Sequence, residues 1–254
     1  MNKYYLLCTN PQYIEEAYKL AKFTDMLEVR QNSNEPLLEN HIPYLLLDDK
    51  GLAIQCQHFK PLYTYEIYTN LKGRKSNILQ ELIIQTIKIK NKAKDQVTIL
   101  DLTAGFGKDS NLIASFGYNV IMVERNPVLA TIIYHAILHN YFNNNVQIIY
   151  MDSIDYLESF NSLLPIDAIY LDPMFEQDKS SKAKKEMQII DNIISTFDTL
   201  DNSFQSNARL FKLAQNITKK IIIKRDNKQK PLIDNPKPSY SKLGKTIRYD
   251  VYQL

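Results

Sequence analysis

Apolar residues in the C-terminal part of the chain, from Val97 onward, follow two alternating patterns. Short runs that are apolar throughout are typical of buried strands, and stretches whose apolar residues recur every three or four positions are typical of helices. The expected strands are 97–102, 119–123, 146–150, 166–171 and 220–224, and the expected helices are 109–116, 127–139, 154–160, 181–197 and 208–215. Such strands, alternating with helices, indicate a parallel sheet covered on both faces. The tail, residues 245–253, alternates polar and apolar side chains, which predicts an antiparallel strand at the sheet edge.

The N-terminal part of the chain carries a different pattern. It predicts a strand, an amphipathic helix and a hairpin with a glycine in its turn, at residues 4–8, 11–22, and 44–47 with 52–57. A longer helix is expected over residues 76–90, with Ser76 as its N-cap. We therefore expect a small α+β appendage over residues 1–72 and a main α/β domain over residues 73–254.

No apolar run in the sequence approaches the roughly 20 residues that a helix needs to cross a bilayer. The apolar segment at residues 4–8 is too short for the core of a signal peptide, and no small-residue cleavage site follows it. The two cysteines, Cys8 and Cys56, lie far apart and form no CxxC pair, which is typical of buried thiols in a reducing compartment. These features predict a cytoplasmic protein without a membrane partner.

Positive charge is concentrated in two blocks, although the whole chain carries a formal net charge of only +3. Residues 219–248 hold ten Lys and Arg against two Asp, a net of +8, and residues 72–94 hold seven against one Glu, a net of +6. Blocks of basic residues favour a polyanionic partner such as a nucleic acid. Lysine-rich loops that are simply hydrated give the same pattern, so charge alone leaves both interpretations open.

A glycine-rich turn follows the first strand of the main domain, in the order Asp101-Leu-Thr-Ala-Gly105-Phe-Gly107. Glycines permit a tight turn and let a ligand approach the backbone where a Cβ would block it. The spacing differs from the GxGxxG dinucleotide fingerprint, because Thr103 stands at the first glycine position. Ligands bind at the carboxyl ends of strands in open α/β sheets, so Asp101, Gly105 and Gly107 are candidate ligand-binding residues. A tight turn without a ligand is the alternative.

Acidic residues also follow the next two strands. Glu124 lies 23 residues after Asp101, close to the spacing of about 20 residues at which a carboxylate meets the ribose hydroxyls of a nucleoside. Two carboxylate oxygens match two neighbouring hydroxyl donors. Asp152 and Ser153 follow the third strand and are suited either to hydrogen-bond an adenine amine or to cap the next helix.

The fourth strand ends in the tetrapeptide Asp172-Pro173-Met174-Phe175. A planar amine is hard to methylate because its lone pair is delocalised. Acceptor oxygens from an Asp side chain and a neighbouring carbonyl can orient its N–H bonds while an aromatic ring stacks on the base. The proline restricts Asp172 to extended geometry and fixes the turn. An ordinary Asp-Pro turn is the alternative, but its place in this series of strand ends predicts Asp172, Pro173 and Phe175 as catalytic residues.

The four strand ends together favour a site for S-adenosylmethionine (SAM) over a site for a nicotinamide dinucleotide. A dinucleotide would need the GxGxxG turn and a pyrophosphate at the start of the following helix. Asp109 stands there and places an anion where a phosphate would bind. SAM carries a sulfonium and no phosphate, so this substitution argues against an oxidoreductase.

Two histidines, His135 and His139, have the i, i+4 spacing of a zinc-binding pair on a helix. The glutamate of an HExxH motif is missing between them, and the sequence reveals no third ligand. We therefore expect no metal site in this protein.

With these residues identified, the chain resembles the bacterial 16S ribosomal RNA guanine-N2 methyltransferases of the small-subunit type J. The resemblance covers about residues 73–252 and rests on six stretches: Asp101–Asp109, Met122–Pro127, Tyr170–Phe175, Lys184–Met187, Ile223–Arg225 and Gly244–Tyr252. It implies a Rossmann-like class I SAM methyltransferase fold, with a mostly parallel seven-stranded sheet and helices on both faces. It also implies SAM as the cofactor and 16S ribosomal RNA or the small ribosomal subunit as the partner.

The resemblance further implies which side chains contact SAM: Lys108, Asp109, Glu124, Arg125, Asp152, Ser153 and Asp172. The family usually has Arg in place of Lys108, so a cation is retained while bidentate geometry is lost. It commonly has Ser in place of Asp152, which leaves an acceptor at that position. The first 60 or so residues match the family only loosely. The segment at residues 73–76 has fewer glycines here than in the family.

The hypothesis from the sequence is transfer of the SAM methyl group to the exocyclic N2 of a guanine in 16S ribosomal RNA, with Asp172 accepting from the target amine. The base must be unpaired or flipped to reach such a pocket. The RNA phosphates are expected along five basic residues: Lys182, Lys184, Lys185, Lys224 and Arg225. Two alternatives stay open. One is an amine methyltransferase for DNA adenine or protein glutamine, because D-P-x-F resembles the motif that those enzymes share. The other is a SAM- or RNA-binding assembly factor without catalysis.

Overall fold

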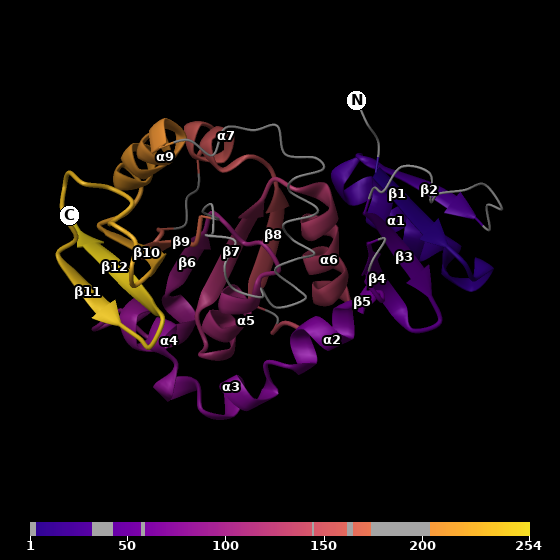
Figure 1. Cartoon of the computed structure of the whole chain (residues 1–254), viewed down its shortest axis with the longest axis horizontal. Coiled ribbons are helices and arrows are strands. Elements are labelled where there is room, and N and C mark those ends of the chain that lie inside the picture. The colour runs from indigo at the N-terminus through magenta and orange to yellow at the C-terminus, as the bar shows by residue number, and fades with distance from the viewer. Residues whose placement is uncertain (1–3, 32–42, 57–58, 144, 162–164, 174–203) are drawn as a thin grey trace. The chain divides into compact units, whose positions relative to one another are not determined.

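The computed structural model of the chain describes residues 4–31, 43–56, 59–143, 145–161, 165–173 and 204–254 (Figure 1). Two compact units divide these residues. Unit 1 contains the residues before Leu71 together with Asn126–Tyr141, and unit 2 contains the described parts of Leu71–Arg125, Phe142–Phe175 and Asp201–Leu254. The break before Leu71 lies close to the boundary proposed from the sequence. The grouping of residues 126–141 with unit 1 was not indicated by any sequence pattern.

Unit 1 combines a small sheet with helices. Its elements are β1 (Tyr4–Cys8), η1 (Pro11–Tyr13), α1 (Ile14–Thr24), β2 (Leu27–Gln31), β3 (Tyr44–Asp48), β4 (Gly51–Gln55), β5 (Leu62–Tyr63), α2 (Thr64–Thr69) and α6 (Pro127–Leu138). The strand order is β2-β1-β3-β4-β5, with β1 parallel to both of its neighbours and the other pairs antiparallel. The expected hairpin is confirmed as β3 and β4, whose turn ends at Gly51 with a φ of 102°.

Helix α6 is the apolar centre of unit 1. Apolar side chains surround its axis, and six of them are buried: Val128, Leu129, Ala130, Ile132, Ile133 and Ala136. The Asn126 side chain caps the helix by accepting from the N–H groups of Val128 and Leu129, and Pro127 occupies the first position, where a missing N–H costs nothing. Phe23 of α1 stacks on Tyr134 of α6, with ring centroids 4.2 Å apart. These contacts fix α1 against α6.

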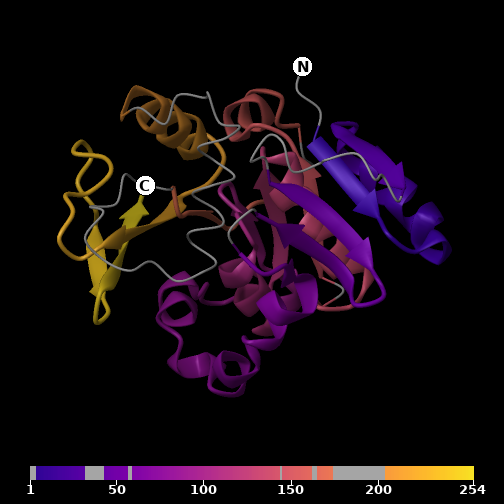
Figure 2. The same cartoon turned by 45° about the vertical axis from the view of Figure 1, so that its right-hand side comes forward.

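Unit 2 is the α/β part of the chain. Its elements are α3 (Lys72–Ser76), η2 (Ile78–Gln80), α4 (Leu82–Ile87), η3 (Lys94–Gln96), β6 (Thr98–Asp101), α5 (Lys108–Ser115), β7 (Asn119–Glu124), β8 (Val146–Tyr150), α7 (Ser153–Glu158), β9 (Ala168–Leu171), α9 (Phe204–Gln215), β10 (Lys220–Asp226), β11 (Tyr240–Leu243) and β12 (Ile247–Gln253). The strand order is β11-β12-β10-β9-β6-β7-β8. All neighbours are parallel except β12, which is antiparallel to β10 and β11 (Figures 1 and 2). The predicted seven-stranded, mostly parallel sheet is confirmed.

Helices cover both faces of the unit 2 sheet, as expected. Leu100 of β6 packs in one apolar cluster with Leu157 of α7 and Phe211 of α9. Successive side chains along a strand point to opposite faces. Asp101, the next residue, therefore points to the other face, where it accepts a hydrogen bond from Ser110 of α5.

The single helix expected over residues 76–90 is wrong. The chain instead forms the short helices α3, η2 and α4. Ser76 is the last residue of α3 rather than an N-cap, and its hydroxyl donates to the carbonyl of Lys72. The break before α4 falls at Glu81, whose backbone is extended (φ −63°, ψ 125°) and whose carboxylate accepts from Arg74 at 2.6 Å.

Three strands lay outside the sequence prediction, namely β2, β5 and β11. The helix predicted over residues 181–197 lies outside the described residues. Within the part of the chain that the structure describes, no helix is both long and apolar enough to cross a membrane.

Truncating a buried leucine of the unit 2 sheet should destabilise the fold far more than truncating an exposed one. Leu100 is 0% exposed and Leu243 is 69% exposed. Leu100→Ala leaves a cavity between β6 and its covering helices, so the free energy of unfolding should fall by about 2–5 kcal/mol. Leu243→Ala should change it by less than about 0.5 kcal/mol. Urea denaturation of both variants checks this, and equal losses would contradict the packing described.

Candidate functional site

Four acidic residues and a lysine lie along one edge of the unit 2 sheet. β10, β9, β6, β7 and β8 are parallel neighbours in that order, so their carboxyl ends share this edge. Asp101 and Glu124 are the last residues of β6 and β7, Asp172 directly follows β9, and Asp152 follows β8 after one residue. Lys224 lies in β10. Open α/β sheets bind their ligands at this edge.

The glycine-rich loop between β6 and α5 leaves open space in front of its backbone. Gly105 and Gly107 both have positive φ values, 56° and 66°. A Cβ built on Gly105 would meet no atom of the described residues within 4 Å, so this part of the chain leaves the space before Gly105 open to a ligand. The Gly105 N–H donates to Glu124 at 2.7 Å, which ties the loop to the end of β7. The loop and the Glu124 carboxylate thus border the same open space.

Asp101 supports this loop from inside the protein. Its side chain is buried and accepts from the Thr103 N–H at 3.0 Å and from the Ser110 hydroxyl. Burial raises the pKa of Asp101 to about 7, although both hydrogen bonds oppose the shift. Sequence reasoning placed Asp101 among the ligand-binding residues, and the structure places it beneath the loop as a positioning residue.

A second group of charged side chains centres on Lys224. Its ammonium donates to Asp109 at 2.9 Å and to Asp172 at 2.7 Å. The Tyr170 hydroxyl also donates to Asp109, at 2.8 Å, and Arg74 lies 3.7 Å from the same carboxylate. One cation therefore bridges the start of α5 to the turn that follows β9.

The charges of this group set the protonation of both carboxylates. Burial alone would raise the pKa of Asp109, but Lys224, Tyr170 and Arg74 hold it below its usual value. Burial raises the pKa of Asp172, Asp109 adds to that rise, and Lys224 opposes it. Burial would lower the pKa of Lys224, but the two carboxylates raise it, so the lysine stays charged.

Thr103 links the glycine-rich loop to the Asp-Pro turn. The backbone N–H of Asp172 donates to the Thr103 hydroxyl at 2.6 Å. Sequence reasoning noted Thr103 only as a departure from the dinucleotide fingerprint and assigned it no role. The Asp172 side chain keeps 39% of its surface exposed, although the surrounding protein desolvates its carboxylate. Pro173 is the last described residue of this turn, and Phe175 lies outside the described residues.

Asp152 caps the helix that follows β8. One of its oxygens accepts from the Ile154 N–H at 2.8 Å, and the other lies 3.7 Å from the Arg125 guanidinium. The Ser153 hydroxyl donates to the carbonyl of Leu102, beside the glycine-rich loop. Of the two roles considered for this pair, the structure shows the cap, which also fixes the residues at the same sheet edge as Glu124.

The basic residues expected along RNA phosphates are placed differently. Lys182, Lys184 and Lys185 lie outside the described residues. Lys224 belongs to the charged group of the site.

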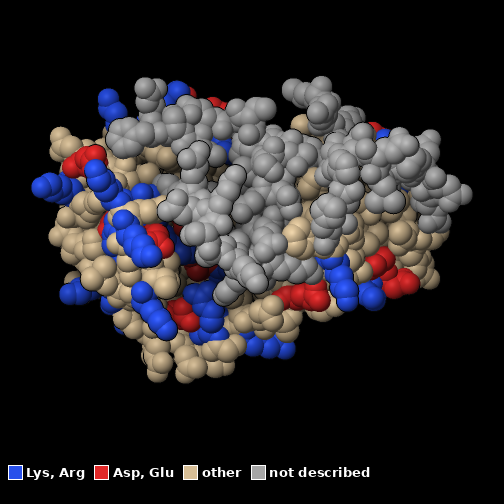
Figure 3. Space-filling model, viewed as in Figure 1, with Lys and Arg blue, Asp and Glu red and all other residues tan. Residues whose placement is uncertain are grey.

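Arg225 is a correction to the expected phosphate contacts. It is only 8% exposed, and its guanidinium donates twice to the carbonyl of Lys230, at 3.1 and 2.9 Å. Its guanidinium therefore lies inside the fold and supports the loop that contains Lys230. Other Lys and Arg side chains are concentrated on the surface around β11, β12, α3 and α4 (Figure 3).

The site as a whole suits a ligand with hydroxyl and amine donors. Glu124, Asp152 and Asp172 place carboxylates along this edge of the sheet, and the Glu124 carboxylate accepts from the Gly105 N–H. Asp109, in the first turn of α5, disfavours a phosphate at that helix start. These residues fit a nucleoside without phosphate groups and a planar amine next to it.

Known proteins are similar in sequence to most of this chain. A family model described as "Putative SAM-dependent methyltransferase" matches residues 36–254. Ribosomal RNA small subunit methyltransferase J of Legionella pneumophila (strain Corby) is 37% identical over 61% of this chain, and the alignment spans 63% of that relative, less than two thirds of its length. The protein of the same name from strain Lens is 36% identical over 86% of this chain and 87% of the relative. That of Coxiella burnetii is 34% identical over 68% and 66%.

A solved structure shares the fold. The crystal structure of a SAM-dependent methyltransferase from Neisseria gonorrhoeae superimposes with a TM-score of 0.71 and covers 98% of this chain and 95% of that protein. The two sequences are 19% identical, so this likeness concerns the fold alone.

The raised pKa of Asp101 should appear in the pH dependence of stability. The folded protein binds this proton up to about pH 7, whereas an unfolded aspartate releases it near about pH 4. The folded state therefore holds more protons than the unfolded state in this window, and the free energy of unfolding should fall as the pH rises through it.

Asn cannot titrate, so the free energy of unfolding of Asp101→Asn should not fall as the pH rises through this window. Urea denaturation at several pH values between about 4.5 and about 7.5, the window between the unfolded and folded pKa values, measures how the free energy of unfolding depends on pH. Asp95→Asn, at an exposed position, is the matched control and should keep the wild-type slope. An unchanged slope in Asp101→Asn would show that this carboxyl does not titrate in the window.

Proposed function

Because the chain belongs to the ribosomal RNA small subunit methyltransferase J family of SAM-dependent methyltransferases, we propose that it methylates the exocyclic N2 of a guanine in 16S ribosomal RNA. SAM is the methyl donor, and the reaction takes place in the cytoplasm on free RNA or on the small ribosomal subunit. The donor is assigned to the edge of the unit 2 sheet at Gly105 and Glu124, and the target amine to the Asp172 turn.

One observation carries this proposal, the hydrogen bond from the Asp172 N–H to the Thr103 hydroxyl. It joins the turn that would orient the amine to the loop that would hold the cofactor. The reacting groups in a methyl transfer must be aligned in line and in close contact, and alignment of this kind supplies most of the rate gain. A fixed distance between the two binding elements is therefore what the reaction needs.

The residues that would hold SAM are those around the open space at the sheet edge. Glu124 offers a carboxylate for the ribose hydroxyls, and the Gly105 backbone allows close approach. Asp152, Ser153, Lys108 and Arg125 are further proposed contacts, with Asp109 fixing Lys224 in place. Bound SAM supplies a methyl group activated by its positive sulfonium.

Asp172 is proposed to act on the target amine. Its carboxylate accepts a hydrogen bond from the N2–H of guanine, which turns the nitrogen lone pair towards the methyl donor. As the N–C bond forms, the C–S bond of the sulfonium would break, and its electron pair would stay on sulfur as a neutral thioether. The nitrogen would become positive, and Asp172 can take up the proton that the nitrogen then releases. Pro173 keeps the backbone of Asp172 extended for this task. Phe175 is proposed to lie near the base.

Lys224 is proposed as a positioning residue. In the structure its ammonium lies 2.7 Å from Asp172 and opposes the effect of burial on that carboxyl. A carboxylate that remains charged is the form that accepts the amine hydrogen bond. Lys224 therefore supports the reaction through Asp172 and is no longer proposed as an RNA phosphate contact.

Ribosomal RNA as the substrate is supported by charge and by the relatives. The basic blocks of the sequence fall within unit 2, the same unit as the site. A basic surface attracts phosphates without sequence preference, and binding of this kind weakens with salt. The choice of guanine N2 comes from the family and not from the geometry of the site.

Transfer of labelled methyl groups from SAM tests the proposal directly. Unmodified 16S RNA and unmodified small subunits are incubated with enzyme and SAM, and the nucleosides are then analysed. We expect N2-methylguanosine with at least one substrate, and a rate lowered at least about 100-fold in Asp172→Asn. Absence of this nucleoside from both substrates would reject the acceptor. Label on DNA adenine or protein glutamine instead would favour the alternative enzymes, and an unaffected Asp172→Asn would reject the mechanism only.

Removing the Lys224 ammonium should change the pH profile of methyl transfer. In Lys224→Gln the effects of burial and of Asp109 on Asp172 are no longer opposed, so the pKa of Asp172 rises further. The acid limb of the profile should then move to higher pH, and each unit of movement lowers the rate about tenfold on the acid side. Lys228→Gln, at an exposed position of the same basic block, controls for weaker attraction to RNA. An acid limb that stays in place would show that Lys224 does not set the charge of Asp172.

A further inference from the structure

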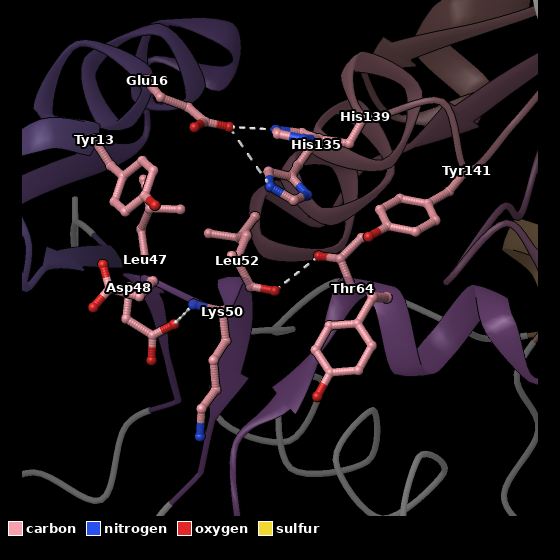
Figure 4. A pocket seen from close by; sticks show the side chains of 13 residues that line it. Tyr13, Glu16, Leu47, Asp48, Lys50, Leu52, Thr64, His135, His139 and Tyr141 are labelled. Carbon is pink, nitrogen blue, oxygen red and sulfur yellow. Dashed lines mark hydrogen bonds and ion pairs between the residues drawn. The ribbon is translucent and has the colours of Figure 1, made fainter.

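Three side chains with metal-binding atoms converge in unit 1, whereas the described residues of the proposed reaction belong to unit 2. They are Glu16 of α1, His135 of α6 and His139, which directly follows α6. Their ligand atoms all lie within 4.8 Å of one another. A single oxygen of Glu16 lies 2.7 Å from Nε2 of His139 and 3.6 Å from Nε2 of His135 (Figure 4).

The fold brings these residues together from distant parts of the chain. His135 and His139 are one helical turn apart, so their rings share a face of the helix, and they stack with centroids 4.2 Å apart. Glu16 precedes His139 by 123 residues and is brought close by the packing of α1 on α6. The sequence revealed no third ligand because this separation follows no local spacing rule. The structure supplies one.

His135 is a buried residue whose ring nitrogens have no hydrogen bond. The residue is 3% exposed, and neither nitrogen has a hydrogen-bond partner among the described residues. Buried polar atoms of native proteins are nearly always satisfied.

A cavity of about 220 Å³ adjoins the three side chains. It is bordered by Tyr13, Asp48, Lys50, Thr64 and Tyr141, all from unit 1 (Figure 4). This volume is ample for water, which needs about 30 Å³ per molecule in the liquid. A cation held by the three side chains would therefore have room for a solvent ligand.

We propose that Glu16, His135 and His139 bind a divalent transition-metal ion, with Zn²⁺ the best match. Two imidazole nitrogens and one carboxylate oxygen form a set that zinc accepts, with water as the fourth ligand. Ligand atoms at about 2.0–2.1 Å from a tetrahedral zinc are about 3.3 Å apart. The observed spacings of 2.7 and 3.6 Å lie on either side of this value. Small side-chain movements are thus enough to admit the ion.

The ion would satisfy Nε2 of His135 and link α1 to α6. Unit 1 would gain a cross-link between two segments far apart in sequence, and its stability would then depend on metal. This inference goes beyond the proposed methyl transfer and does not rest on it.

Equilibrium dialysis of the full chain against buffered free Zn²⁺, with metal content measured by mass spectrometry, tests the site. The wild-type protein should take up a single zinc ion per chain. At free zinc about 100 times the Kd, its Tm should rise by about 5–10 °C relative to protein treated with chelator.

Variants at half-buried Glu16 and exposed His139 test the assignment of ligands. Glu16→Gln and His139→Asn should each lower zinc affinity more than about 100-fold, beyond the 10–100-fold loss expected from an outer partner. Glu15→Gln makes the same change at an exposed position of the same helix and should bind like wild type. His41, His58 and both cysteines are retained in all these variants, so they cannot explain a loss. Circular dichroism and the Tm without metal confirm that each variant is folded.

Two results would overturn the proposal. One is a wild-type protein that takes up no zinc at micromolar free metal. The other is a folded Glu16→Gln or His139→Asn variant that binds zinc as tightly as Glu15→Gln, because the ion would then be held elsewhere.

Discussion

The edge of the unit 2 sheet depends on one ammonium group shared between two carboxylates. Asp109 and Asp172 could not both stay charged at close range without a cation between them, and Lys224 lies within 2.9 Å of each. Strand register fixes this cation. Ile223 of β10 is paired with Leu171 of β9, so the next residues along the two parallel strands, Lys224 and Asp172, lie side by side. The charge balance of the site is therefore set by the pairing of two buried strands.

Thr103 is a second side chain that connects separate elements of the site. In a dinucleotide-binding turn this position is glycine, but here its hydroxyl accepts from the backbone of Asp172. The loop after β6 and the turn after β9 are thereby joined, although their strands are already neighbours. Two elements that would bind different reactants are thus linked by a direct hydrogen bond. Thr103, which departs from the dinucleotide fingerprint, connects the loop proposed to hold the cofactor to the turn proposed to orient the amine.

The sequence predicted those parts of the fold that depend on local pattern. Strands such as β6, buried at every position, stand out as apolar runs, and the apolar stretch over residues 127–139 predicted α6. β11 was missed because its side chains are mostly exposed and polar, and only its pairing with β12 makes it a strand. Among the proposed site residues, sequence order identified the strand ends. It could not identify that Asp101 faces inward or that Arg225 is buried, because both depend on packing between distant segments.

Helix α6 gives unit 1 a discontinuous construction. The helix that centres this unit is encoded between two strands of the other unit, β7 and β8. A fragment that ended at Asn70 would lack it and would leave its packing partners, such as Phe23, facing water. Unit 1 is consequently not a module that could be removed or exchanged as the N-terminal segment alone, because residues 126–141 belong to it as well.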